Sequence, residues 1–373
     1  MPNPNAILAN ITRIDPPLDK PAAELLRGSE RGLDIEFANA RRAHLDPADP
    51  RSAGFADILE TLRRDKRLVY VEVDPANDAI TRLLIPKVTR VVAIGPPTAD
   101  GIAVELAYSH ARHLLRRDHP DFEALDEALR AAHAKRLRAI VVEDEAHRIL
   151  ELRFMPGPDD GPIPDLPPFP ERLNWFERFW RWRWWPWWWF GCVSAAKAQQ
   201  MFDLVSATSC NPLTVPPPCI PFLYPDDGCW ARAHEMCRLM IDAGVTPRKL
   251  WIVGSLHVST KNNPYCEVWW GWHVAPTLCV RKWRWWWWWA SEKMVIDPAL
   301  FTGPVSAATW KSVQGDPNAA LYPHDASVYY RWSANNLETD PTYSKTWGYL
   351  EDYRLYLKNR SLQLGPPPYA NCP

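Results

Sequence analysis

The chain has 373 residues, a length that suits two domains better than one hydrophobic core. Its 43 lysine and arginine residues nearly balance 44 aspartate and glutamate residues, which excludes a global field that would draw it to nucleic acid or acidic lipid. The N-terminus lacks the basic start and apolar run of a secretory signal, and no run of about 20 uncharged apolar residues predicts a membrane-spanning helix. The localisation therefore stays open between the cytoplasm and export, as an effector, by a non-classical route.

Residues 1–155 contain neither cysteine nor tryptophan, and their pattern predicts a small α+β domain. A helix is predicted over 120–136, where apolar residues recur every three or four positions and Asp118 or a neighbouring residue could cap the start. Strands are predicted where apolar residues alternate or cluster, over 67–73, 80–85, 88–94, 102–108, 138–142 and 147–154. No nucleophile clusters with a base in this region, so packed or solvated roles are favoured over ligand roles for its histidines, His44, His110, His113, His119, His133 and His147.

The segment 156–174 is rich in proline, aspartate and glycine, which predicts an extended linker to a second domain over 175–373. Two tryptophan-rich segments, 175–190 and 283–289, lie within this second domain and combine tryptophan with arginine. Three interpretations stay open for them: contact with a membrane interface, a platform for protein substrates, or packing of the two segments on each other.

All eight cysteines lie in the C-terminal half. No CxxC pair or matching histidine spacing predicts a zinc site, so neither a metal nor another cofactor is expected. After a helix predicted over 193–207, Cys210 and Cys219 lie nine residues apart in a proline-broken loop, and they are the best candidate for a disulfide. The pairing of the other cysteines stays open.

Residues 225–244 contain the strongest catalytic signal. Four turn residues, 225–228, lead directly into a helical pattern that Gly244 ends. Cys229 therefore falls at a helix N-terminus, where unpaired backbone N–H groups and the helix dipole stabilise a thiolate and the oxyanion of a tetrahedral intermediate. These properties predict a nucleophile, with a buried structural cysteine as the alternative.

A base and an acid for this cysteine are expected on two antiparallel strands downstream. The segments 267–280 and 293–300 are rich in β-branched and aromatic residues. If the turn between them centres on Trp285, His273 and Asp297 lie twelve positions to either side and face each other. Cross-strand partners have Cβ atoms about 5 Å apart, close enough for a carboxylate to orient an imidazole.

Other side chains compete for roles at this site. His234 lies five residues after Cys229 on the same helix and is interpreted as structural, while His257 lies on a predicted strand with no acid opposite it. Turn formation is favoured over catalysis for both Asp226 and Asp227. Beside His273, Trp270 and Trp272 are candidates for binding the substrate or the oxyanion.

At these residues the sequence resembles the bacterial protein-glutaminase family, which are protein-glutamine deamidases of papain-like or transglutaminase-like fold. The family's cysteine, histidine and aspartate fall on Cys229, His273 and Asp297, and its paired loop cysteines fall on Cys210 and Cys219. The matching stretches span about residues 193–335 and include YPDDGCWARAHEM, WWGWHVA, VIDPALFTGPVSAATW and SVYYR. Residues 102–154 are similar to the family's inhibitory propeptide, which implies that 1–155 covers the active site until the linker is cut.

The resemblance implies an α+β fold in which a helix-start cysteine packs on an antiparallel sheet, preceded by a propeptide-like domain. It also implies a hydrolase that converts protein-bound glutamine to glutamate through a cysteine thioester and releases ammonia. Its partners would be proteins with exposed glutamine. Two features depart from the family, namely the lack of a visible secretion signal and the tryptophan-rich segments. The alternatives are a transglutaminase, a cysteine protease, or a membrane-binding module with a toxin or effector role.

Overall fold

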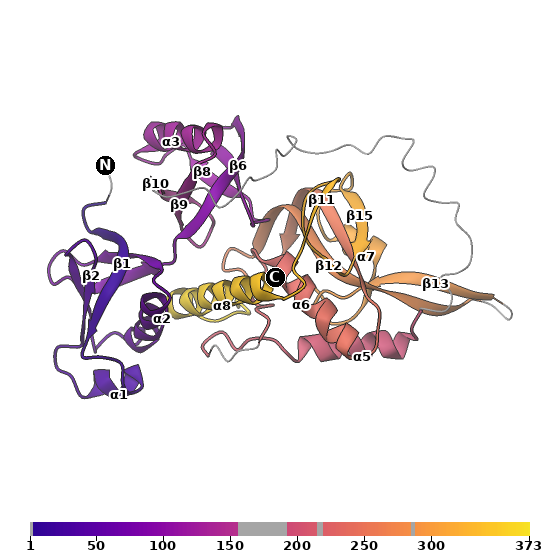
Figure 1. The fold of residues 1–373 in the computed structure, drawn as a ribbon, viewed down its shortest axis with the longest axis horizontal. Helices are drawn as coiled ribbons and strands as arrows, with labels where there is room; N and C mark the ends of the chain where they lie inside the picture. The colour runs from indigo at the N-terminus through magenta and orange to yellow at the C-terminus, as the bar shows by residue number, and fades with distance from the viewer. Residues whose placement is uncertain (1–2, 156–191, 215–218, 285–287) are drawn as a thin grey trace.

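The computed structural model describes residues 3–155, 192–214, 219–284 and 288–373 (Figure 1). The predicted linker 156–174 and the tryptophan-rich segment 175–190 lie outside the described residues, as do the side chains of 283–289. Within the described residues the fold is α+β, with helices packed on antiparallel sheets. No helix in the described ranges is both long and apolar enough to cross a membrane.

Residues 3–84 form one unit around a five-stranded antiparallel sheet of order β3-β2-β1-β4-β5. Helix α2 packs on it because Phe55, Ile58, Leu59 and Leu62 recur at helical spacing and are fully buried. The elements are β1 (Ala6–Asp15), α1 (Ala22–Arg27), β2 (Leu33–Phe37), β3 (Arg42–Leu45), α2 (Ser52–Arg64), β4 (Leu68–Val73) and β5 (Ile80–Leu84).

Residues 87–154 form a second unit with its own five-stranded antiparallel sheet, of order β10-β9-β6-β7-β8. Its helix α3 lies within the predicted range, although Asp118 makes an ion pair with Arg116 and does not cap the helix. The elements are β6 (Lys87–Pro97), β7 (Gly101–Leu106), β8 (His113–Arg116), α3 (Phe122–Ala134), β9 (Arg138–Glu143) and β10 (Ile149–Phe154).

The two N-terminal units have the same topology. Replacing β6 to β10 by β1 to β5 turns one sheet order into the other. Left-handed residues also recur at equivalent places, with Lys66 and Arg136 after the helices and Asp78 and His147 in the last turns. The duplication is not evident in the sequence because buried positions and turn conformations carry it, rather than identical residues. The prediction of one small domain with one helix was therefore incomplete.

The two units differ in their connections: α1 lies between β1 and β2, whereas three residues, 98–100, join β6 to β7. Strands β2 and β3 are joined by four residues, 38–41, whereas β7 and β8 are joined by six residues, 107–112. This longer loop is the part of the N-terminal half that reaches the candidate site described below.

The C-terminal half is built on a five-stranded antiparallel sheet of order β14-β13-β12-β11-β15, with β12 at its centre. The main core contains α5, α6 and the adjoining side chains of the sheet, and a second core includes Trp310 of α7. The elements are α5 (Ala195–Ser206), α6 (Cys229–Asp242), β11 (Arg248–Ser259), β12 (Glu267–Arg284), β13 (Trp288–Val295), β14 (Val305–Ser306), α7 (Ala307–Ser312), β15 (Ala320–Asp325), β16 (Val328–Ser333), β17 (Asn336–Thr339) and α8 (Ser344–Leu364).

Helix α8 joins the two halves and lies between α2 and α6 (Figure 1). Leu350 and Leu357 belong to the core around α6, while Leu355 belongs to the core of the first N-terminal unit. The Asn359 side chain donates a hydrogen bond to the Leu83 carbonyl at 2.8 Å. Because one helix supplies side chains to both cores, the N-terminal half is packed on the C-terminal half and not merely tethered to it.

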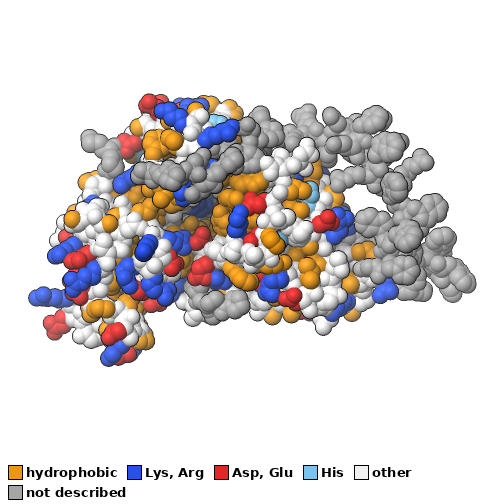
Figure 2. Space-filling model, in the orientation of Figure 1, with side chains coloured by type: hydrophobic (Ala, Val, Ile, Leu, Met, Phe, Trp, Pro, Cys, Tyr) orange, Lys and Arg blue, Asp and Glu red, His pale blue; other side chains and the backbone are white. Residues whose placement is uncertain are grey.

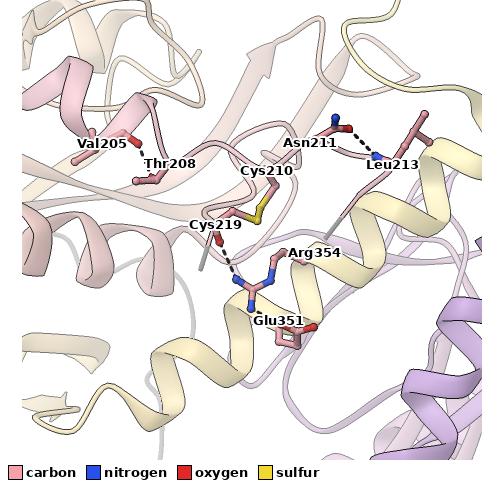
Figure 3. The surroundings of a disulfide bond; sticks show 8 residues. All are labelled: Val205, Thr208, Cys210, Asn211, Leu213, Cys219, Glu351 and Arg354. Atoms are coloured by element: carbon pink, nitrogen blue, oxygen red, sulfur yellow. Dashed lines mark hydrogen bonds and ion pairs between the residues drawn. A yellow bond between two sulfur atoms is a disulfide. The ribbon is translucent and has the colours of Figure 1, made fainter. Parts of the chain in front are cut away.

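Six cysteines form disulfides, namely Cys210 with Cys219, Cys192 with Cys279, and Cys266 with Cys372. Figure 3 shows the first of these beside α8, where the Arg354 guanidinium donates to the Cys219 carbonyl at 2.8 Å. The surface in Figure 2 carries lysine and arginine interspersed with aspartate and glutamate over the N-terminal half, in keeping with the balanced charge of the sequence.

Candidate active site at the start of helix α6

Cys229 is the first residue of α6, and its thiol is free and buried. The preceding Gly228 has a φ of 82°, and a Cβ at this position would lie 2.4 Å from the ring of Tyr353. Only glycine therefore allows the sharp turn that starts the helix at the cysteine. Helix α6 packs on the central strand β12, and the backbone of Val274 on that strand lies near the Cys229 sulfur.

His273 lies on β12, and one of its ring nitrogens is within 4.8 Å of the Cys229 sulfur. Its Nε2 lies 2.9 Å from Oδ2 of Asp297, and the indole N–H of Trp310 donates to the same oxygen at 2.8 Å. The ring of Trp270 stacks on the imidazole at a centroid distance of 4.6 Å. The imidazole is therefore held on one edge and one face, while Nδ1 has no hydrogen-bond partner among the described residues.

The register that brings His273 and Asp297 together differs from the predicted one. Leu278 pairs with Met294 and Thr277 with Val295, a shift of two positions from a turn centred on Trp285. Strand β13 ends at Val295, so Asp297 is not a cross-strand partner. Instead the backbone N–H of Ile296 donates to the Pro276 carbonyl, and the Asp297 side chain reaches His273 from beyond the strand. The predicted pair is close in space, but the predicted reason for its proximity was wrong.

Burial shapes the electrostatics of the two acidic groups. It would raise the pKa of Asp297, but His273 and the hydrogen bonds from His273 and Trp310 outweigh it, so the pKa lies below its usual range. Burial also raises the pKa of the Cys229 thiol well above its usual range, more than Arg232 and the Val274 N–H lower it. In this conformation the cysteine is therefore a thiol, and the thiolate predicted at the helix start would require access to water.

The loop 107–112 of the N-terminal half lies directly over this site. The backbone N–H of Gly271 donates to the His110 carbonyl at 3.1 Å, and that of Arg112 donates to the Trp269 carbonyl at 2.9 Å. Ala111 forms an antiparallel bridge with Trp270. The loop thus pairs with β12 as a short extra strand beside His273.

His110 places its side chain in the site, where its ring centroid lies 5.7 Å from that of His273. One of its nitrogens is within 4.8 Å of both the Cys229 sulfur and a nitrogen of His273. Burial lowers the pKa of His110 to about 3, so the imidazole is neutral. The sequence analysis considered clusters within the N-terminal half only, and this grouping was missed because it spans both halves of the chain.

Asp227 anchors the loop. Its carboxylate accepts hydrogen bonds from the Ser109 hydroxyl at 2.6 Å, the His110 backbone N–H at 3.0 Å and the Lys87 ammonium at 3.1 Å. Although burial opposes ionisation, Lys87 and these hydrogen bonds hold the pKa of Asp227 well below its usual range. The residue is fully buried, and its carboxylate also accepts the backbone N–H of Gly228 at 2.9 Å, so it lies in the turn before α6 and in addition holds the loop, a role that the sequence did not indicate.

Asp226 is also a buried ion-pair residue. Its carboxylate accepts two hydrogen bonds from Arg360 of α8, at 2.7 and 3.0 Å, and one from the Asn263 amide. Its backbone carbonyl accepts the indole N–H of Trp270 at 3.0 Å. The two aspartates before Cys229 therefore connect the helix start to α8, β12 and the N-terminal half.

A second polar cluster lies within the N-terminal side of this interface. The Ser109 hydroxyl is 2.9 Å from Nε2 of His113, whose Nδ1 is 2.5 Å from Glu143. Glu143 also lies 2.9 Å from Nδ1 of His147 and 2.8 Å from the Lys87 ammonium. His113, Glu143 and His147 have ligand atoms near enough to one another for a metal ion, and Nδ1 of each histidine is within hydrogen-bond distance of Glu143.

The competing residues lie elsewhere or pack against the site. His234 is buried between the Lys249 ammonium and the Asp340 carbonyl, as expected of a structural histidine. His257 lies 2.8 Å from Glu267, an acid that the sequence did not place near it. Trp272 is partly buried and packs against Trp251 at a centroid distance of 4.9 Å. A cavity of about 440 Å³ beside the site is lined by Ser109, His110, Trp270 and Trp272, among others.

Comparison with known proteins agrees with the predicted resemblance. Residues 198–314, which include Cys229, His273 and Asp297, match the family model described as glutaminase. No curated protein sequence matches the chain significantly.

Three solved structures are similar to this chain. The crystal structure of pro-protein-glutaminase has a TM-score of 0.51 at 21% identity, over 78% of this chain and 99% of that one. A mutant of pro-protein-glutaminase has a TM-score of 0.50 at 22% identity, over 73% of this chain and 94% of that one. The crystal structure of protein-glutaminase has a TM-score of 0.37 at 29% identity, over 49% of this chain and 95% of that one. The first two likenesses show that the chain has the fold of the pro-enzyme.

Proposed function

We propose that this chain is a member of the protein-glutaminase family and hydrolyses the side-chain carboxamide of glutamine in proteins, giving glutamate and ammonia. The main support is that Cys229, at the start of α6, lies close to His273. Nε2 of His273 in turn lies 2.9 Å from the Asp297 carboxylate. All three residues fall within the segment that matches the glutaminase model.

In the proposed reaction His273 takes the Cys229 proton through Nδ1, and the thiolate attacks the carboxamide carbon. The first backbone N–H groups of α6 are free of intrahelical partners and would hold the oxyanion. His273 then gives the proton to departing ammonia, leaving a thioester. Water, deprotonated by the same imidazole, releases glutamate and regenerates the thiol. Asp297 would keep Nε2 protonated and thereby leave the Nδ1 lone pair facing the sulfur.

The surroundings of His273 suggest roles for the two neighbouring tryptophans. Trp270 stacks on the imidazole and is itself fixed by its hydrogen bond to the Asp226 carbonyl, so it would position the base. Trp272 lines the adjacent cavity, which supports a role in contacting the substrate chain. The packing of a helix-start cysteine on the central strand of an antiparallel sheet supports a papain-like or transglutaminase-like catalytic domain over 175–373.

Residues 1–155 would act as an inhibitory, propeptide-like domain joined through a linker over 156–174. The loop 107–112 pairs with β12 beside His273, in the place that an extended substrate would need. Cys229 is only 1% exposed, so a glutamine side chain has no access to it in this conformation. Activity would therefore require displacement or cleavage of the N-terminal half.

A test begins with the full chain carrying a specific protease site within 156–174. After cleavage, ammonia release from casein is measured for the unaltered chain, for Cys229→Ala and for Cys237→Ala. Cys237 is a matched control because it is the second free, buried cysteine of α6. Ammonia from the unaltered chain and Cys237→Ala, but not from Cys229→Ala, is expected. Amine incorporation in place of ammonia would indicate a transglutaminase, and new chain termini in casein would indicate a protease.

A further inference from the structure

Three potential metal ligands from the two halves of the chain meet over helix α6. The Cys229 sulfur and one ring nitrogen each of His110 and His273 all lie within 4.8 Å of one another. Each of the three residues is about 1% exposed. One thiol and two imidazoles are a ligand set typical of Zn²⁺, and the proposed reaction gives no role to His110.

Both imidazoles have a carboxylate on one side and an unused nitrogen on the other. Nε2 of His273 lies 2.9 Å from Asp297, and its Nδ1 has no hydrogen-bond partner among the described residues. Nδ1 of His110 lies 3.0 Å from Oδ1 of Asp227, outside the angle of a good hydrogen bond, and its Nε2 has no partner in the same described set. A buried polar nitrogen without a partner is costly, so both nitrogens are available to bind a ligand.

We propose that the full-length chain binds one Zn²⁺ ion between its two halves, through the Cys229 sulfur, the His273 Nδ1 and the ring nitrogen of His110 that faces away from Asp227. Ligand atoms around a tetrahedral zinc ion lie roughly 3.5 Å apart, so modest side-chain movements close the site. Asp297 and Asp227 supply the outer carboxylates that orient metal-bound histidines. A water molecule completes the coordination.

Binding is balanced in protons and charge. The Cys229 thiol loses its proton to solvent, and both imidazoles bind as neutral ligands. The resulting site carries one net positive charge from the ion and the thiolate, and the carboxylates of Asp227 and Asp297 lie against the two histidines. The positive Arg232 is nearby, but its guanidinium donates to the backbone carbonyls of Tyr224 and Asp227.

The ion would have two effects. It would join loop 107–112 to α6 and β12, and it would occupy the sulfur and the nitrogen that the proposed deamidation needs. Metal binding would thus strengthen the covered state, and metal loss would favour its opening. This consequence rests on the proposed function, whereas the metal site itself does not.

The test uses the metal-stripped full-length chain and Co²⁺ as a spectroscopic probe for Zn²⁺. We expect one equivalent of Co²⁺ to produce a sulfur-to-cobalt charge-transfer band with tetrahedral ligand-field bands, and Zn²⁺ to displace them. Cys229→Ser is expected to remove the charge-transfer band, and His110→Ala to remove or strongly weaken tight binding. Asp297→Asn should weaken affinity by about 10- to 100-fold. The matched controls Cys237→Ser and His257→Ala should bind as the unaltered chain does.

Three results would overturn the proposal: no cobalt binding, binding without a sulfur band, or a full sulfur band in His110→Ala. Cobalt absorption that survives Cys229→Ser would assign the metal to His113, Glu143 and His147. His110→Asn, with near-ultraviolet circular dichroism to establish folding, gives the same answer if the alanine variant does not fold. This measurement needs no substrate, so the two proposals can fail separately. A metal bound by the full-length chain, with no ammonia released by the cleaved and metal-stripped chain, would refute only the deamidase. Ammonia released by the cleaved chain, with no metal bound by the full-length chain, would refute only the metal site.

Discussion

The backbone carbonyl of His110 accepts a hydrogen bond from the N–H of Gly271 at 3.1 Å, two residues before His273. The N-terminal half therefore reaches the site by adding a strand to the sheet that carries the candidate base. This contact depends on the main chain, so the His110 side chain is free to serve a separate purpose. The same strand also places Ala111, which is 4% exposed, against Trp270.

Ala111→Asp should release the loop. The new carboxylate would be buried beside Trp270 without a partner, which costs several kcal/mol and favours the open state. We expect the uncleaved chain to release ammonia from casein at a rate well above that of the unaltered uncleaved chain. Ala76→Asp, at an exposed position in the first N-terminal unit, is the control and should leave the uncleaved chain latent. Equal latency of both variants would argue against the covering role of the loop.

Asp297→Asn should lower the activity of the cleaved enzyme. An amide cannot hold the His273 Nε2–H as a carboxylate does, so the imidazole loses its preferred tautomer. We expect kcat to fall on the order of 10²- to 10⁴-fold with KM little changed. Asp325→Asn, at an exposed aspartate of β15, is the matched control and should retain full activity. Unchanged kcat in Asp297→Asn would remove this residue from the proposed mechanism.

Alkaline pH should weaken the folded state through His147. Burial would lower the pKa of His147, but Glu143 and Asp226 outweigh it and raise the pKa to about 9. Because the folded chain holds the His147 proton more tightly than the unfolded chain, protonated His147 stabilises the fold. This stabilisation is complete below a pH of about 6.5 and is lost as the pH rises toward about 9. The free energy of unfolding should fall by at most roughly 3 kcal/mol across this interval. Thermal unfolding should show this loss as a Tm that declines with rising pH. His147→Gln should flatten the decline, whereas His44→Gln should leave it in place.

Gly228→Ala and Gly244→Ala form a matched pair at the two ends of α6. Both glycines have positive φ, but a Cβ at Gly244 meets nothing within 4 Å, whereas one at Gly228 meets the Tyr353 ring at 2.4 Å. Gly244→Ala should cost about 1 kcal/mol from backbone strain alone. Gly228→Ala should lower the free energy of unfolding further and reduce kcat, because it moves the helix start that carries Cys229. Chemical denaturation measures the free energy of unfolding, and kinetics of the cleaved enzyme measure kcat. Equal effects of the two variants would contradict the special role of Gly228.

The long-range disulfide should stabilise the chain more than the local one. Cys266 and Cys372 are separated by 106 residues, and Cys210 and Cys219 by 9. The loop-entropy relation gives about 5 kcal/mol for the first and about 3 kcal/mol for the second. Replacing each pair by alanine should therefore lower Tm more for Cys266 and Cys372. The reverse order in denaturant unfolding would show that local packing at the Cys210 loop dominates.

The sequence by itself determined the features that arise from neighbouring residues. A turn followed by helical spacing placed Cys229 at a helix start, and apolar periodicity located α3, α5 and α6. Most strands of 67–154 were also predicted, because they alternate over several residues. Strand β1 was missed because a bulge between Ile11 and Arg13 breaks its alternation, and α2 lacks a side-chain cap at its start.

Only the tertiary structure decided which distant residues meet. The register of β12 and β13 differs by two positions from the predicted one, because sheet packing sets strand pairing and the turn sequence alone does not. The burial of Asp226 and Asp227, and the approach of His110 to Cys229, depend on the docking of one half of the chain on the other. Local sequence encodes backbone conformation, but contacts across more than a hundred residues follow from how completed sheets and helices bury their remaining surfaces.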